Sequence, residues 1–222
     1  MACWIDVVKD WQTLIAGVLA IVAAFIGGGF VWLQTQTVDR REQARLERQH
    51  KAALAVLPLA ISAFVEYAQQ CAVGLLPVLR SAVDEVVPVA ARVAFVPPVL
   101  DSAVIPQLRD AIENAPEGFS DRIAALIAGG QVLASNLRSL PDKTSPSTLV
   151  LKANIEEYIA RAGIIFARGA ALFEYARGKS GVVPPANPSE DDVRAAINVM
   201  SFEFVNEERI YDIAFRLLSG VQ

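Results

Sequence analysis

The residues of this chain that could do chemistry are few, and most of them are carboxylates. Glu156 and Glu157 are adjacent, and Glu203 stands four positions before Glu207. Paired acids can act as general acid and base or bind two metal ions, but a dimetal site on helices also needs histidines. The chain has one histidine. We therefore expect these acids to lie on solvated helix surfaces, with no catalytic residue, no metal and no cofactor.

The remaining reactive side chains are His50, Cys3 and Cys71. His50 lies in a charged segment, which predicts an exposed imidazole. The apolar segment 14–33 separates the two cysteines, and if it crosses a membrane the thiols lie on opposite sides and cannot form a disulfide. We expect Cys71 to be a small buried hydrophobic residue.

Two short stretches contain glycines that could belong to a known binding motif: "IAGGQ" at 127–131 and "GIIFARGA" at 163–170. Neither fits a P-loop, a dinucleotide-binding turn or a nucleophile elbow, and both fall in helical patterns. They predict close helix packing, and the sequence predicts no enzyme. The formal net charge of -4 and a single short basic cluster mixed with acids also predict no nucleic-acid partner.

The elements that carry these residues begin with an apolar segment at 14–33, behind a short tail at 1–13. No ionisable side chain lies between Trp11 and Val38. As a helix the segment is about 30 Å long, which is the thickness of the hydrocarbon core of a bilayer. Trp11 and Trp32 lie near its ends, where indole rings favour the membrane interface. The sequence predicts one N-terminal transmembrane helix, and membrane lipid as a partner.

A cleaved signal peptide is the alternative for this segment. Its start carries Asp6 and Asp10, whereas an export signal has a clearly positive start, so we favour the uncleaved helix. Basic residues follow the segment, in "DRREQARLERQHK", and Lys9 alone precedes it. By the positive-inside rule we expect the N-terminus outside and the C-terminal domain in the cytoplasm, at a bacterial inner (plasma) membrane.

Small residues recur every fourth position along the predicted transmembrane helix, at Ala16, Ala20, Ala24 and Gly28. Such a face lets a second helix approach closely, which predicts a homo-oligomer or a partner membrane helix. The alternative is that the face contacts lipid alone, because glycine and alanine are frequent in membrane helices.

A charged juxtamembrane helix is expected at 34–51. Arg41, Arg45 and Arg48 share one of its faces and are candidates for contact with lipid headgroups, each contributing about 1 kcal/mol near an anionic surface. Acidic residues in the same segment offset much of this charge. The alternative is a solvated segment that serves only as a topology signal.

The rest of the chain, 52–222, predicts an α-helical domain, so the fold class expected is all-α, a helical bundle after the membrane helix. Residues 52–65 are apolar but shorter than a membrane span, which favours a buried helix over a re-entrant or second membrane segment. Prolines interrupt 81–106, where we expect short helices. Linkers are expected near 97–101 and 179–188.

Capping residues and 3–4 spaced apolar residues mark the later helices. We expect helices from Ser102 to Asn114, from Ser120 to Leu140 with Ser120 as the cap, and from Ser145–Pro146 to Gly178. Ser189 with Asp192 resembles a capping box, and one final helix is expected to run from there to Ser219.

The stretch "KDWQTLIAG", Lys9 to Gly17, resembles the N-terminal segment of uncharacterised single-pass membrane proteins of bacteria. The resemblance reaches at most through the charged segment after the helix. It implies a bacterial membrane location and brings no activity with it.

Two functions fit these expectations. The first is a non-enzymatic protein-interaction or scaffolding role for a membrane-anchored helical protein. The alternative is a membrane-tethered sensor or regulator that binds a small apolar ligand in its helical domain. An internal cavity in that domain would favour the second.

Overall fold

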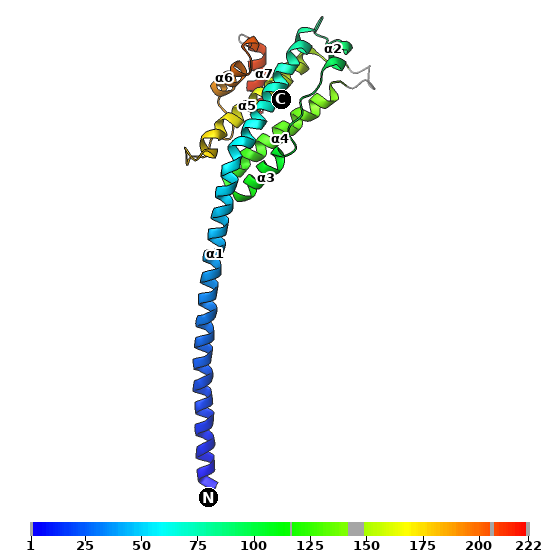
Figure 1. Ribbon diagram of the computed structural model, residues 1–222. Helices are drawn as coiled ribbons and strands as arrows, with labels where there is room; N and C mark the ends of the chain where they lie inside the picture. Colours follow the sequence, from blue (N-terminus) through cyan, green and yellow to red (C-terminus); the bar gives the residue numbers. More distant parts are fainter. Residues whose placement is uncertain (1, 116, 142–148, 205–206, 221–222) are drawn as a thin grey trace. The chain divides into compact units, whose positions relative to one another are not determined.

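The computed structural model describes residues 2–115, 117–141, 149–204 and 207–220, without the side chains of 2–31, 33, 37, 39, 46–47, 50, 114, 117 and 202. Apart from isolated bridges between Val83, Val86 and Leu151, the elements in these ranges are helices, and the fold class is all-α as predicted. Figure 1 shows them in chain order: α1 (Ala2–Arg80), α2 (Val89–Ala94), α3 (Val104–Asn114), α4 (Glu117–Ser139), α5 (Lys152–Ala176), α6 (Glu190–Met200), the 3₁₀ turn η1 (Phe202–Phe204) and α7 (Glu208–Ser219).

The chain divides into two compact units, residues 1–49 and 50–222. In the first unit the backbone of 14–33 is helical, within α1. Most of its side chains, including the small-residue face of Ala16, Ala20, Ala24 and Gly28, lie outside the described residues. Trp32, which is described, has 63% of its surface exposed.

Within the described residues, the helical segment long and apolar enough to cross a membrane is Lys51–Arg80. The segment 14–33 that the sequence analysis favoured has nearly all its side chains outside the described residues. Length and composition alone do not distinguish a membrane helix from a core helix. One face of Lys51–Arg80 is fully buried in the protein, at Leu57, Ile61, Phe64, Ala68, Cys71 and Leu75. This burial is what the expected buried helix at 52–65 requires, and Cys71 is the small buried residue that we predicted.

Glycines set how closely the helices of the second unit approach. A Cβ on Gly130 of α4 would collide with the ring of Phe64, and a Cβ on Gly169 of α5 would collide with Val65. A Cβ on Gly163 would come within 2.5 Å of Ile197 Cγ1 on α6. The glycines of "IAGGQ" and "GIIFARGA" therefore serve close helix packing, as the sequence indicated.

Helix starts agree with the sequence in one case and differ in another. Ser189 Oγ accepts a hydrogen bond from Asp192 N at 3.1 Å, and Asp192 Oδ2 accepts one from Ser189 N at 3.0 Å, which is the predicted capping box. The expected cap at Ser120 is wrong, because α4 begins at Glu117. The Ser120 hydroxyl instead donates to the carbonyl of Ile112 at 3.0 Å.

The start predicted for the next helix, at Ser145–Pro146, lies outside the described residues. Within the described chain, α5 begins at Lys152, and its N-cap position is Leu151. The amide of Leu151 donates to Asn154 Oδ1 at 2.9 Å, which is one half of a capping box; the leucine side chain does not supply the other half.

The single final helix predicted from Ser189 to Ser219 is also wrong. Ser201 is extended, with φ -162°, and separates α6 from η1 and α7. The break lets α7 fold back so that Ile210, Tyr211 and Ala214 are buried. The Tyr211 hydroxyl donates to the carbonyl of Phe204 at 3.0 Å, which fastens α7 to the turn.

Candidate functional site

A hollow of about 680 Å³ opens between α1, α4 and the segment before α3; we call it the α1–α4 pocket. Its size lies in the range of about 300–1,000 Å³ that is usual for small-molecule sites. The pocket is lined by Phe64, Tyr67, Pro97, Pro98, Val99, Leu100, Asp101, Ser102, Ile105, Ile127, Gly130, Gln131, Ala134, Ser135 and Arg138. Most of these side chains are apolar, so an apolar ligand body fits the pocket.

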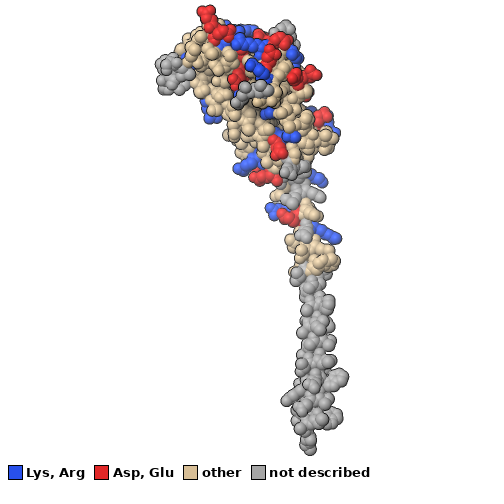
Figure 2. All heavy atoms as spheres, turned by 180° about the vertical axis from the view of Figure 1, so that it is seen from behind, with Lys and Arg blue, Asp and Glu red and all other residues tan. Residues whose placement is uncertain are grey.

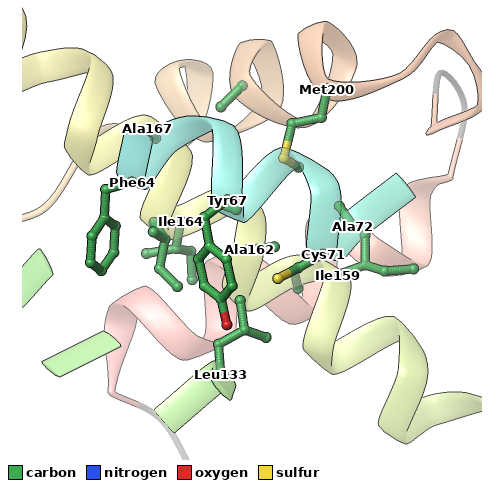
Figure 3. Packing of buried hydrophobic residues seen from close by; sticks show 14 of the residues in the cluster. Phe64, Tyr67, Cys71, Ala72, Leu133, Ile159, Ala162, Ile164, Ala167 and Met200 are labelled. Atoms are coloured by element: carbon green, nitrogen blue, oxygen red, sulfur yellow. The ribbon is translucent and has the colours of Figure 1, made fainter. Parts of the chain in front are cut away.

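Two aromatic rings from α1 form one wall of the pocket. Phe64 and Tyr67 are buried and meet edge to face, with their ring centroids 6.3 Å apart. Figure 3 shows both side chains projecting from the same side of α1, with the Tyr67 hydroxyl toward Leu133. Gly130 of α4 packs directly against the Phe64 ring, where a Cβ would collide with it. Phe64 therefore belongs both to the pocket wall and to the close contact between α1 and α4.

The opposite wall is the segment 97–102, which is not helical. Val99 is 88% exposed and neighbouring Val96 is 82% exposed. Within the described part of the chain, residues 96–100 form no backbone hydrogen bond. Proline pairs favour an extended backbone, so Pro97 and Pro98 explain why the segment does not join a helix. Backbone hydrogen bonding holds this wall at its end, where the carbonyl of Asp101 accepts from Val104 N at 3.1 Å.

Polar groups are few in the pocket. Gln131, Ser135 and Arg138 contribute them from α4, and Asp101 and Ser102 from the opposite wall. The Asp101 carboxylate already accepts a hydrogen bond from the amide of Ala103 at 2.9 Å. A few polar groups in a mostly apolar site usually fix the orientation of a ligand rather than its affinity.

Of the acids singled out in the sequence, Glu157 and Glu203 pair with separate arginines, whereas Glu207 lies near Glu156. Glu157 pairs with Arg161 at 2.7 Å, and Glu203 with Arg80 at 2.6 Å, both at the surface. Among the described residues, no group of three or more His, Cys, Asp or Glu side chains is arranged to hold a metal ion.

Glu156 differs from its neighbours because its carboxylate is buried, with 3% of the side chain exposed. Arg209 Nε lies 2.8 Å from its Oε2 and Lys152 Nζ lies 3.9 Å from its Oε1. The Arg209 N–H does not point at Oε2 in hydrogen-bond geometry. Burial has the largest effect on the pKa of Glu156 and raises it; Arg209 and Lys152 lower it in part, nearby Glu85 and Glu207 raise it, and the pKa is raised on balance.

The turn that brings Glu85 to this cluster is strained. Asp84 and Glu85 have φ of 48° and 63°, in the left-handed region that residues other than glycine rarely adopt. Val83 and Val86 exchange two backbone hydrogen bonds of 2.9 Å across the turn, and the carbonyl of Glu85 accepts from Lys152 N at 2.8 Å. Arg209 Nη1 lies 3.2 Å from Glu85 Oε2. The cluster joins α5, α7 and this turn.

The predicted headgroup contacts Arg41, Arg45 and Arg48 are exposed, and Arg45 pairs loosely with Glu42 at 3.6 Å. On the face of the molecule in Figure 2, basic and acidic side chains are interspersed over the helical domain. The side chains of Cys3 and His50 lie outside the described residues.

The sequence analysis proposed no residue of the α1–α4 pocket as a binding residue. The glycine pair in "IAGGQ" indicated close packing, but not which helix would pack there. Phe64 and Gln131 are far apart in the chain, and only the tertiary contact makes them neighbours.

Comparison of the chain with known proteins finds no matching family, no similar curated protein and no similar solved structure.

Proposed function

We propose that this protein is a membrane-anchored, non-enzymatic binding protein whose helical domain takes a small apolar ligand in the α1–α4 pocket. The observation that carries the proposal is the pocket itself: about 680 Å³, walled by Phe64 and Tyr67 and lined mainly by apolar side chains. Burial of apolar ligand surface contributes about 25 cal/mol per Å². A ligand body that fills such a volume therefore supplies most of its own binding free energy.

The anchor of the proposal is the segment 14–33, as a single helix in a bacterial inner membrane with the helical domain in the cytoplasm. Its support is the run without ionisable side chains between Trp11 and Val38, the exposed Trp32, and the exposed Arg41, Arg45 and Arg48 that follow. An exposed indole beside an apolar segment suits the bilayer interface, and arginines suit its headgroups. A tethered pocket would sample ligands that are concentrated in the membrane.

The test is ligand capture by the full chain in detergent, measured by native mass spectrometry with dodecanol as the probe. We expect wild type to retain one dodecanol per chain. Ala134→Phe places a ring in the pocket and should abolish retention, whereas Val132→Phe, on the same helix at a side chain 46% exposed and outside the pocket, should not.

Retention by Ala134→Phe equal to wild type would contradict the pocket as the site. Failure of wild type to retain the probe would instead favour the protein-interaction role, for which a pull-down of the tagged full chain is the direct measurement.

A further inference from the structure

A second, smaller hollow of about 400 Å³ lies between α5, α6 and the segment 182–188; we call it the α5–α6 pocket. Small side chains line its body, at Ala167, Ala170, Ala171, Ala195 and Ala196, together with prolines from the connecting segment. Several of these side chains are exposed, so the hollow opens to solvent. It shares no lining residue with the α1–α4 pocket.

Two arginines, Arg122 and Arg168, stand in the wall of this apolar hollow. Arg122 Nε donates to the carbonyl of Pro184 at 3.2 Å, and Arg168 Nη2 donates to Asn187 Oδ1 at 3.1 Å. Both acceptors belong to the segment that shapes the pocket. Two uncharged oxygens of this segment, the Pro184 carbonyl and Asn187 Oδ1, therefore hold both guanidinium groups at the α5–α6 pocket.

These arginines differ from most of the arginines that flank α5 and α7. Arg161, Arg194 and Arg209 each have a carboxylate within 3.3 Å. In the part of the chain that the structure describes, neither Arg122 nor Arg168 forms an ion pair. Both side chains are half-buried in a mostly apolar wall, where a cation loses part of its hydration and is stabilised when an anion pairs with it.

The state of Arg168 supports this reading. Its Nε is buried and has no hydrogen-bond partner among the described residues. Burial lowers the pKa of its guanidinium, because the charged form loses hydration. Arginine remains charged at neutral pH, so the Arg168 guanidinium lacks a hydrogen-bond acceptor for its Nε–H.

We propose that the α5–α6 pocket binds a small carboxylate with an apolar body. Arg168 and Arg122 hold the carboxylate, since the planar fork of a guanidinium matches its two oxygens. The alanine and proline side chains hold the hydrocarbon. The volume admits a body of one ring with a short chain, because a cavity of about 150 Å³ already accommodates benzene.

Asp192 also lines the pocket and limits the ligand's charge. Hydrogen bonds from Ser189 lower its pKa, so it stays ionised, and its Oδ2 accepts from both Ser189 N and Ser189 Oγ. Its charge offsets one of the two arginines, so the pocket keeps about one net positive charge, which a singly charged carboxylate neutralises. For this reason the proposal commits to a carboxylate.

The experiment is isothermal titration of the full chain in detergent with 4-phenylbutyrate and its uncharged amide. We expect the acid to bind at least about tenfold more tightly than the amide, as a charge-assisted hydrogen bond implies. Arg168→Gln should weaken binding of the acid by at least about tenfold and leave the affinity for the amide unchanged. Arg177→Gln, which removes an exposed arginine of the same region outside the pocket, is the matched control and should bind as wild type.

The proposal would be overturned by no binding of the acid to wild type, by equal affinity for acid and amide, or by an unchanged affinity for the acid in Arg168→Gln. Ala195→Trp keeps the test decisive if Arg168→Gln unfolds, because Ala195 is exposed and the indole fills the pocket. Binding by Ala195→Trp equal to wild type would also overturn it. Ala134→Phe, in the other pocket, should leave the titration unchanged, which separates this site from the one proposed for apolar ligands.

Discussion

At the scale of single residues, burial decides what a charged side chain does here. Glu156 and Glu157 are neighbours in the sequence, yet one carboxylate is 3% exposed and the other 35% exposed. The two side chains lie on different faces of α5. Glu156 points toward Arg209 of α7, and this arginine and Lys152 of α5 only partly compensate the desolvation of the carboxylate. The same reasoning separates Arg168, whose Nε is buried without an acceptor, from Arg161, which has a carboxylate at 2.7 Å.

The raised pKa of Glu156 predicts a pH-dependent stability. Above the ordinary glutamate pKa of about 4.3 the unfolded chain has released this proton while the folded chain still holds it, so the free energy of unfolding falls as pH rises to the raised value. Glu156→Gln removes that fall. Thermal melts from pH 4 to pH 8 should show the variant gaining on wild type as pH increases.

Glu157→Gln is the control for this prediction, since its carboxylate is partly exposed and should not produce the same pH-dependent gain. If wild type instead gained on Glu156→Gln with rising pH, the ion pair with Arg209 would outweigh the desolvation of the carboxylate.

At the scale of helices, close approach at glycine decides the packing of the domain. Gly163 of α5 meets Ile197 of α6, and Gly130 of α4 meets Phe64 of α1. Both contacts cost helix propensity, since glycine is about 1 kcal/mol less favourable than alanine in a helix. The packing that they allow must therefore contribute more than this.

Paired glycine substitutions test the packing argument. Gly163→Ala should destabilise the protein by about 1 kcal/mol, because overpacking costs about 1–3 kcal/mol against a propensity gain of about 1 kcal/mol. Gly118→Ala, in the first turn of α4, should stabilise it, since the nearest atom to the added Cβ is 3.9 Å away. Chemical denaturation of both variants measures the change in the free energy of unfolding. A stabilised Gly163→Ala variant would refute the close contact with Ile197.

At the scale of the whole molecule, the two units predict separable properties. Residues 50–222 form a compact unit of their own with a shared core, so they should fold without residues 1–49. The full chain should sediment with membranes, and the truncated chain should be soluble, helical by circular dichroism and cooperative on melting.

This truncation also distinguishes the two apolar segments. A truncated chain that still sediments with membranes would assign the membrane contact to Lys51–Arg80, the other segment long and apolar enough to span. An intact, lipid-free full chain in the soluble fraction would refute the N-terminal anchor.

The sequence by itself determined the all-α class, the capping box at Ser189, the buried Cys71 and the close packing at the glycines. These follow from spacing, local hydrogen bonds and side-chain size, which act over one or two helical turns. It also predicts an anchor at 14–33, a prediction that awaits the fractionation experiment.

Only the tertiary structure decided where the last predicted helix is interrupted and which residues line the two pockets. The final helix divides at Ser201 although no proline or glycine marks the place, because α7 buries Ile210 and Tyr211 only by folding back. Helix packing likewise brings Arg122 of α4 and Arg168 of α5 to one pocket with the prolines of the segment between α5 and α6. Contacts between residues far apart in the chain depend on how helices pack, and no local pattern encodes that packing.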